Sequence, residues 1–223
     1  MRVAVLIPVL NEEEALPLVL AALPRDVHVV VCDNGSTDRS PELAAGLGAT
    51  VVSWPRRGYG GAVLAGIRAL AEHPPDVVVV LDGDHSFDAA DLPSLLGPIE
   101  RGEADFVLGE RLSLAEAGAL TPQQRVGNRL ANALIRANTG HAYRDQGPFR
   151  AIRYDRLLAL GMSDLTWGWN VEMQMKAVHH GLRILEVPVR CRPRVGTSKI
   201  SGTLSGVVRA GAKITYACWR YRG

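Results

Sequence analysis

The strongest constraint in this sequence is an alternation of short apolar runs with segments of helical periodicity. Runs rich in Val, Ile and Leu cover residues 2–8, 27–32, 49–54, 76–82 and 104–110. Between them, apolar residues recur every three or four positions and predict helices over residues 12–23, 36–48, 58–73 and 88–100. Apolar strands separated by helices are typical of a mainly parallel sheet covered on both faces. The first half therefore predicts an α/β fold.

The second half of the chain is less regular. We expect a helix over residues 121–139 that stops at Gly140, and then a loop, a short strand and a helix within residues 144–160. A further helix should cover residues 168–181, followed by a strand over 182–194 that Pro188 interrupts. No internal repeat or linker is evident, so the 223 residues predict one domain.

Composition excludes several classes of protein. Hydrophobic residues make up 47% of the chain, which is enough for a substantial core, yet no run of about 18 apolar residues could span a bilayer. The apolar N-terminal stretch is too short for a signal peptide. Cys32, Cys191 and Cys218 are odd in number and lack CxxC spacing, which favours reduced thiols in a cytoplasmic protein.

The charge is unevenly distributed. The net charge is +2, but the residues after Glu186 carry eight Lys and Arg and no acid, which leaves −6 on residues 1–186. A basic tail on an acidic body suits an anionic partner for the C-terminal region, or simply a solvated helix end. The acidic body and the absence of a recognition motif disfavour a nucleic-acid partner.

Two aspartates stand where the apolar run over residues 76–82 ends. The carboxylates of Asp82 and Asp84 are two positions apart, so they project to the same side of an extended segment. A divalent cation such as Mg²⁺ or Mn²⁺ would remove their repulsion, and Mg²⁺ prefers few protein ligands together with substrate phosphates. The alternative is that Asp84 or Asp88 caps the next helix, which would not explain Asp82.

Other polar motifs follow other predicted strands. "PVLNEE" at 8–13 and "DNGSTD" at 33–38 each end an apolar run, and ligands of parallel sheets bind at such ends. With "RDQGPFRAI" at 144–152 and "EVPVRCRPRVGTSKISG" at 186–202, they resemble the processive and polyprenyl-phosphate glycosyltransferases of family 2, which have the GT-A fold. The resemblance is strongest to the dolichyl-phosphate mannosyltransferase and polyprenyl-phosphate glucosyltransferase branch.

The resemblance implies roles in binding a nucleotide sugar. The base and ribose would be held by Pro8, Leu10, Glu12 and Asp33. Asp82 and Asp84 would hold the metal, with Ser86 or a water as a third ligand. Arg57, in the glycine-rich stretch "PRRGYGGA", would face a phosphate, although a plain strand-to-helix loop is as good an interpretation. Arg194 and Lys199 would close over the diphosphate.

The resemblance also implies a catalytic set of Asp145, Asp84 and Arg111. Asp145 would be the catalytic base or a group that orients the acceptor, and a structural ion pair with Arg144 or Arg150 is the alternative. Arg111 would lie near the acceptor or donor phosphate, unless it forms a surface ion pair with a nearby acid, Asp105 or Glu110. An ionised acceptor phosphate would demand little of a base.

Relatives often carry an acid at the position of Glu172. Trp167 and Trp169 precede it, and their rings could stack on a sugar or lipid or could cover the core. The pattern leaves both interpretations open.

The C-terminal segment predicts an amphipathic basic helix. We expect a GT-A domain over residues 1–202, with a helix over 203–223 as part of the same unit. One face of this helix would carry Leu204, Val207, Val208, Gly211, Ile214 and Cys218. Such a helix suits an anionic membrane surface, packing against the domain, or a homodimer.

Taken together, the motifs predict a metal-dependent, inverting hexosyltransferase that uses a UDP- or GDP-sugar. The expected acceptor is a polyprenyl phosphate, which would place the enzyme in the cytoplasm or peripherally at the cytoplasmic membrane face. A soluble acceptor and an inactive nucleotide-sugar-binding module are the alternatives. A sugar-1-phosphate nucleotidyltransferase is disfavoured because "PVLNEEE" lacks the glycine- and arginine-rich loop that this class requires.

Overall fold

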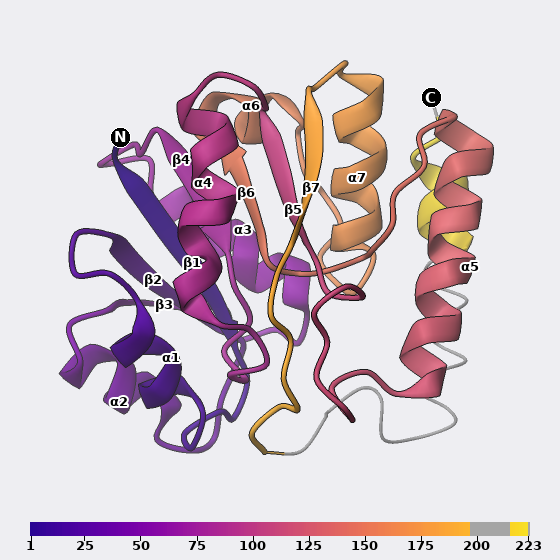
Figure 1. Ribbon diagram of the computed structural model, residues 1–223. Helices are drawn as coiled ribbons and strands as arrows, with labels where there is room; N and C mark the ends of the chain where they lie inside the picture. The colour runs from indigo at the N-terminus through magenta and orange to yellow at the C-terminus, as the bar shows by residue number, and fades with distance from the viewer. Residues whose placement is uncertain (197–214, 223) are drawn as a thin grey trace.

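Figure 1 shows the computed structural model, which describes residues 1–196 and 215–222. Its centre is a sheet of seven strands in the order β3-β2-β1-β4-β6-β5-β7. The strands are β1 (Val3–Val9), β2 (His28–Asp33), β3 (Thr50–Ser53), β4 (Val77–Val80), β5 (Phe106–Glu110), β6 (Arg150–Arg153) and β7 (Ile184–Pro188). Every neighbouring pair is parallel except those of β6 with β4 and β5. The predicted mainly parallel sheet is confirmed, and β6 adds one antiparallel strand.

Helices cover both faces of this sheet, as predicted (Figure 1). The first face packs against α3 (Tyr59–Ala69), α6 (Tyr154–Ala159) and α7 (Trp169–His179), and α5 (Pro122–Thr139) packs beside α7. The second face packs against α1 (Leu16–Ala22), α2 (Ser40–Gly46) and α4 (Leu92–Glu100), with the short 3-10 helix η1 (Ala89–Asp91) before α4. The fold is therefore a three-layer α/β arrangement.

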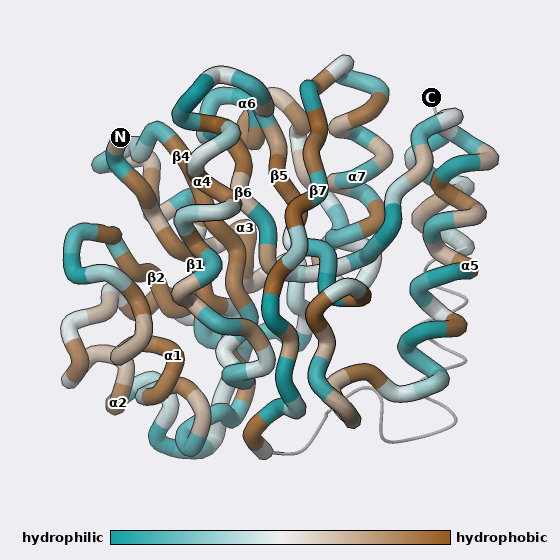
Figure 2. Tube along the Cα trace, in the orientation of Figure 1, coloured by the Kyte–Doolittle hydropathy of each residue, from teal (hydrophilic) through white to brown (hydrophobic). Residues whose placement is uncertain are grey.

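The strands divide the buried residues into two cores. In β1, Ala4 and Leu6 belong to one core, whereas Val5 and Ile7 belong to the other, because successive side chains point to opposite faces of a strand. Figure 2 shows the central strands as the most hydrophobic part of the trace. Burying each Val, Leu or Ile side chain contributes about 1.5 to 3 kcal/mol, so the two cores are a main source of stability.

Helices α1 and α2 begin four residues later than the sequence predicts. α1 begins at Leu16 rather than residue 12, and α2 begins at Ser40 rather than residue 36, each with a proline in its first turn. The N-cap residue of α2, Arg39, makes no side-chain cap bond, and Asp38 Oδ1 accepts from the Ser40 N–H at 3.0 Å instead. By contrast, α5 ends as predicted, with Gly140 at φ 75° in the left-handed region.

The described C-terminal residues pack on the domain. Residues 215–220 are helical, and Ala217 and Cys218 are buried in the core that α7 shares. The Tyr221 hydroxyl lies 3.3 Å from Ser163 Oγ. The rest of the predicted stripe, from Leu204 to Ile214, lies outside the described residues, as does Lys199. None of the described helices is long and apolar enough to span a bilayer.

One ion pair, between the buried Asp105 and the half-exposed Arg183, ties the start of β5 to the start of β7. The carboxylate of Asp105 accepts hydrogen bonds from Arg183 Nε at 2.9 Å, Nη2 at 2.8 Å and the Arg183 backbone N–H at 3.1 Å. The hydrogen bonds from Arg183 lower the pKa of Asp105 to about 2. Because this pKa is depressed, the pair stabilises the fold above the ordinary carboxyl pKa, and that stability is lost as the pH falls towards 2.

We therefore expect Asp105→Asn to lower the free energy of unfolding by about 1 to 2 kcal/mol at pH 7, a figure reduced for the half-exposed Arg183 side chain. The difference between the variant and the wild type should shrink at pH 3. Urea unfolding at both pH values measures it. Glu103→Gln is the matched control, because the Arg101–Glu103 pair is exposed and its loss should change little. An Asp105→Asn deficit that is the same at both pH values would contradict this assignment.

Candidate functional site

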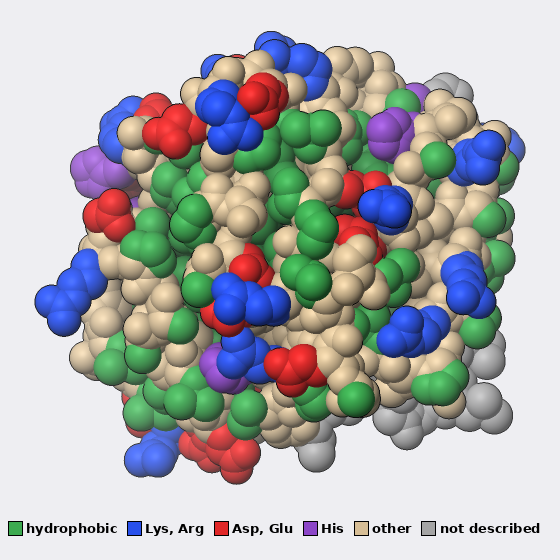
Figure 3. Space-filling model, viewed as in Figure 1, with side chains coloured by type: hydrophobic (Ala, Val, Ile, Leu, Met, Phe, Trp, Pro, Cys, Tyr) green, Lys and Arg blue, Asp and Glu red, His purple; other side chains and the backbone are tan. Residues whose placement is uncertain are grey.

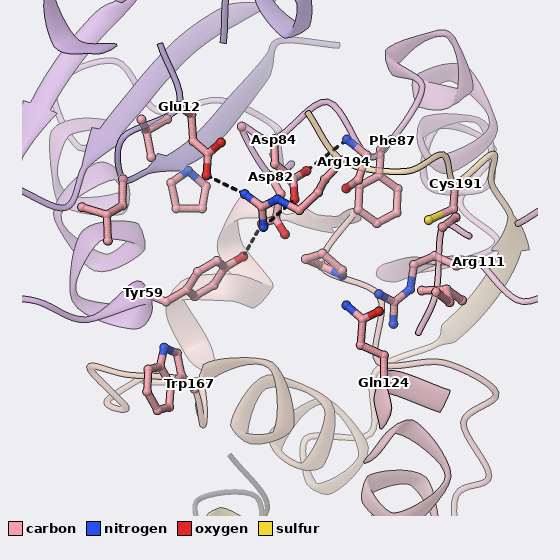
Figure 4. A pocket seen from close by; sticks show the side chains of 18 of the residues that line it. Glu12, Tyr59, Asp82, Asp84, Phe87, Arg111, Gln124, Trp167, Cys191 and Arg194 are labelled. Carbon is pink, nitrogen blue, oxygen red and sulfur yellow. Dashed lines mark hydrogen bonds and ion pairs between the residues drawn. The ribbon is translucent and has the colours of Figure 1, made fainter. Parts of the chain in front are cut away.

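A cavity of about 1100 Å³ lies at the carboxyl ends of the strands (Figure 4). The loops after β1, β2 and β4 all contribute to its lining, so the predicted convergence of three strand ends is found. The opposite wall comes from the segment after β5 and from the start of α5. The lining includes Pro8, Leu10, Glu12, Asn34, Arg57, Tyr59, Asp82, Asp84, Arg111, Gln124, Trp167 and Arg194.

The carboxylates of Asp82 and Asp84 both face this cavity (Figure 4). The Tyr59 hydroxyl donates to Asp82 Oδ1 at 3.3 Å, and the Ser86 backbone N–H donates to Asp84 Oδ1 at 3.0 Å. His85, between Asp84 and Ser86, has φ 58°, a left-handed conformation that non-glycine residues rarely adopt. This sharp turn brings the Ser86 N–H back to Asp84 and fixes the second carboxylate.

The electrostatics of the pair favour a bound cation. Burial, together with the negative charge of Asp84, raises the pKa of Asp82 to about 7. Among the described residues, no group of three or more His, Cys, Asp and Glu side chains is arranged to hold a metal. The pair therefore offers two hard oxygen ligands and leaves the other positions to phosphate oxygens and water, which is how Mg²⁺ is usually bound. Mn²⁺ or Mg²⁺ fits these residues.

Arg194 places a positive charge at the same point. Its Nη2 lies 2.8 Å from Glu12 Oε1, and its Nη1 lies 3.4 Å from Asp84 Oδ2. The Val195 backbone N–H also donates to the Asp84 carbonyl at 3.0 Å, which holds this segment over the pocket. One guanidinium thus joins the loop after β1 to the loop after β4. Lys199, the other predicted cation of this segment, lies outside the described residues.

Two of the sequence motifs brace each other. The Asn11 backbone N–H donates to Ser36 Oγ at 3.0 Å, Asn11 Oδ1 accepts from the Thr37 N–H at 2.7 Å, and the Glu12 N–H donates to Ser40 Oγ at 2.9 Å. Asn11 has φ 54°, so its backbone is held in an uncommon conformation. These bonds give "NEE" and "DNGSTD" a structural reason to occur together.

Asp33 contributes to this brace and is absent from the lining of the cavity. It is buried, and its carboxylate accepts from the backbone N–H groups of Gly35 at 3.2 Å and Ser36 at 3.0 Å. The next residue, Asn34, lines the cavity instead, and its Oδ1 accepts from the Gly58 N–H at 3.0 Å. The loop that Asp33 shapes, more than its own carboxylate, faces the open space.

Asp145 pairs with Arg111. Its fully buried carboxylate accepts from Arg111 Nε and Nη2, both at 2.7 Å, and from the backbone N–H groups of Arg111 at 2.9 Å and Gln146 at 2.8 Å. Burial opposes ionisation, but the bonds and charge of Arg111 hold the pKa of Asp145 below its ordinary value. Asp145 does not line the cavity, so the geometry disagrees with a role as catalytic base.

This pair also corrects the predicted alternatives for both residues. Neither Arg144 nor Arg150 is the ion-pair partner of Asp145, and neither nearby acid is the partner of Arg111. Asp105 binds Arg183, and the Glu110 carboxylate accepts from the hydroxyl and backbone N–H of Ser113. What remains is an arginine aimed at the cavity by a buried carboxylate.

The glycines before and within α3 lie where the chain packs closely against other backbone and side chains. A Cβ at Gly58 or Gly60 would collide with the backbone carbonyls of Leu165 and Asp164, and one at Gly61 would meet the Trp54 ring. These glycines therefore admit close packing of protein against protein rather than the approach of a ligand. Arg57 itself does line the cavity.

Sequence reasoning missed several residues of the lining, including Asn34, Tyr59, Gln124 and Cys191. Tyr59 stands between glycines at the start of a predicted helix, and Gln124 completes a capping box with Thr121. Both signals locate a helix end. Neither says which cavity that end will border, because the packing of the helix on the sheet decides it.

Comparison with known proteins identifies the family of this chain. A family model described as "Glycosyl transferase family 2" matches residues 4–158. An uncharacterized glycosyltransferase of Mycobacterium tuberculosis is 42% identical over 210 residues, covering 93% of this chain and 94% of that protein. A dolichyl-phosphate hexose transferase of Haloferax volcanii is 34% identical, covering 98% and 95%, and an undecaprenyl-phosphate mannosyltransferase of Micrococcus luteus is 32% identical, covering 92% and 90%.

A solved structure has the same fold. Glucosyl-3-phosphoglycerate synthase from Mycobacterium tuberculosis, in complex with Mn²⁺, UDP and glucosyl-3-phosphoglycerate, superposes with a TM-score of 0.78 at 22% identity. The match covers 100% of this chain and 80% of that one. The fold is therefore that of the GT-A glycosyltransferases, and the chain belongs to glycosyltransferase family 2.

Proposed function

We propose that this glycosyltransferase moves a hexose from a UDP- or GDP-sugar to the phosphate of a polyprenyl phosphate, with Mg²⁺ or Mn²⁺ at Asp82 and Asp84. The observation that carries the proposal is two cavity-facing carboxylates surrounded by Arg57, Arg111 and Arg194. Such a set suits a divalent cation together with an anion of high charge, which a nucleotide diphosphosugar provides. The synthase of similar fold that was solved with Mn²⁺ and UDP supports this choice of donor class.

The nucleotide would lie along the loops after β1 and β2. Pro8, Leu10 and Glu12 line that end of the cavity, and Asp33 would act by shaping the loop beside it. Arg57 would face a phosphate from the segment before α3. Arg194 would turn from Glu12 and Asp84 to the diphosphate, and we assign Lys199 to the same task.

Transfer would be a single displacement with inversion. An oxygen of the acceptor phosphate forms a bond to the anomeric carbon, the bond from that carbon to the diphosphate oxygen breaks, and the nucleoside diphosphate leaves. When bound, the cation supplies positive charge against the charge that develops on the diphosphate. The acceptor phosphate is already ionised near neutral pH, so no strong base is needed. Arg111 would hold that phosphate, and Asp145 would position Arg111.

The surroundings of Arg111 suit a lipid acceptor. The exposed apolar side chains of Leu112, Leu114, Val126 and Leu130 lie on the segment after β5 and on α5. Basic side chains gather over α5 on the face that Figure 3 shows, where they could meet anionic headgroups. The curated relatives named for dolichyl and undecaprenyl phosphates support the same acceptor class. We therefore propose that the enzyme acts as a peripheral protein at the cytoplasmic face of the membrane. Residues 1–202 and 203–223 would act as one unit.

The proposal is tested by donor binding followed by transfer. Thermal shifts with UDP, GDP, UDP-glucose and GDP-mannose, each with Mn²⁺ and with EDTA, should show a metal-dependent rise for one base. The matching sugar-labelled donor should then transfer label to undecaprenyl phosphate in detergent, measured in the organic phase. Asp84→Asn should abolish the transfer without unfolding the protein, because one of only two carboxylate ligands is lost.

Asp88→Asn is the matched control, since asparagine can still cap η1 and Asp88 lies outside the cavity lining. It should keep most of the activity. Label found only in a water-soluble product would favour a soluble acceptor, and metal-dependent binding without transfer to any acceptor would favour an inactive module. Full transfer by Asp84→Asn would contradict the metal assignment.

Arg194→Gln should change metal and nucleotide binding in opposite directions. Without nucleotide, the variant should bind Mn²⁺ about three- to tenfold more tightly, because the guanidinium no longer competes for Asp84. With Mn²⁺ present, it should bind the nucleoside diphosphate about tenfold more weakly, because a charge-assisted contact is lost. Calorimetric titrations of Mn²⁺ alone, and of the nucleotide at saturating Mn²⁺, measure both effects.

Arg192→Gln serves as the control for that experiment. Arg192 Nη2 lies 2.9 Å from Asp88 Oδ2, so this neighbouring arginine bears on neither Glu12 nor Asp84. Both affinities should stay within about twofold of the wild type. A Mn²⁺ affinity that Arg194→Gln leaves unchanged would show that Arg194 does not compete with the cation.

A further inference from the structure

The segment between α6 and α7 forms one wall of the cavity and presents an exposed indole there. Thr166 and Trp167 both line the cavity, and Trp167 is 40% exposed. Figure 4 shows Trp167 and Tyr59 on the same side of the view, opposite Arg111 and Gln124. Trp169, two residues later, is fully buried in the core. Trp167, by contrast, is not among the residues that pack against this core.

A buried carboxylate holds this segment in place. Glu172 accepts from the Ser163 backbone N–H at 2.9 Å, from Ser163 Oγ at 2.8 Å and from the Asp164 N–H at 2.7 Å. Lys176 Nζ lies 2.7 Å from the same carboxylate and balances its charge. Asp164 Oδ1 in turn accepts from the Thr166 N–H at 2.7 Å. Two carboxylates therefore fix the turn that precedes Trp167.

The other side of the segment docks on the start of α3. The Gly61 N–H donates to the Leu165 carbonyl at 2.9 Å, and the Gly60 N–H donates to the Thr166 carbonyl at 3.3 Å. The same turn of α3 carries Tyr59, whose hydroxyl bonds Asp82. Trp167 is thus tied to the side of the cavity that holds the two aspartates, whereas Arg111 and Gln124 lie across the open space (Figure 4).

We propose that Trp167 is the platform on which the hexose ring of the donor stacks, and that Glu172 is the positioning residue that holds this platform. The inference rests on the proposed function, because it takes a nucleotide-linked hexose as the ligand. A pyranose ring has an apolar face of C–H groups, and a flat, rigid indole is suited to cover it. The docking on α3 ties the indole to the helix turn that carries Tyr59, the hydrogen-bond partner of Asp82.

The test separates the sugar from the nucleotide. Calorimetry with Mn²⁺ gives the dissociation constant of the nucleoside diphosphate and of its hexose conjugate, and the ratio of the two isolates the contribution of the sugar. Trp167→Ala should raise the dissociation constant of the conjugate about five- to tenfold. It should leave that of the nucleoside diphosphate within about twofold of the wild type. Trp167→Phe should restore most of the loss. Trp219→Ala is the matched control, because Trp219 is 57% exposed and outside the cavity lining.

A second variant tests the positioning role. Ser163→Ala removes one hydrogen bond to Glu172 without changing a charge. It should weaken binding of the conjugate by a smaller factor than Trp167→Ala does. In the Trp167→Ala background, the same substitution should leave the ratio unchanged, because its effect passes through the indole. A merely structural role would lower the thermal stability in both backgrounds and would not act on the ratio at all.

The outcomes distinguish this inference from the proposed function. If the wild type binds no nucleoside diphosphate under any condition, the proposed function fails and this inference fails with it. If the wild type binds both ligands and Trp167→Ala leaves their ratio unchanged, only the platform is overturned. If Trp167→Ala raises only the KM for the lipid acceptor, the platform is also overturned, because the indole would then contact the acceptor.

Discussion

The architecture of the site follows from placing two carboxylates at the edge of an apolar sheet. Asp82 and Asp84 repel each other in a partly buried setting where charges are poorly screened, so compensating charge must come from nearby. Arg194 supplies it from the front of the cavity. Arg150, the first residue of β6, is fully buried and forms no ion pair within the described part of the chain. Burial lowers its pKa to about 10, opposed by the negative charges of Asp82 and Asp145. The carboxylates and the arginines are therefore one electrostatic unit.

The acidic residues of the different motifs perform different tasks. Glu12, Asp82 and Asp84 face the cavity, whereas Asp33 and Asp145 use their carboxylates to fix loops and an arginine. The difference lies in the direction of each side chain, which the order of residues does not reveal. A motif that resembles a ligand site thus contains both the site and the scaffold that holds it.

The sequence was sufficient for the sheet and for part of the site. Strands such as β4 are apolar at every position, which leaves burial on both faces as the only stable arrangement, and parallel connections bring their carboxyl ends together. Helix starts were less predictable, because Pro17 and Pro41 mark the first turns more decisively than the acids before them. Tyr59 and Gln124 were out of reach, since their places depend on how α3 and α5 pack.

The antiparallel strand β6 has a consequence for the order in which the molecule assembles. It pairs with β4 on one side and β5 on the other, so among the described strands it alone joins β1 to β4 with β5 and β7 in the sheet. Pairing β6 with β4 closes a loop across residues 81–149, and such long-range closure is slow compared with the local βα steps before it. During synthesis, the aspartates at the end of β4 therefore emerge well before β6, the strand that pairs with β4. A nascent chain acquires the acidic edge first and the wall that makes it a binding site last.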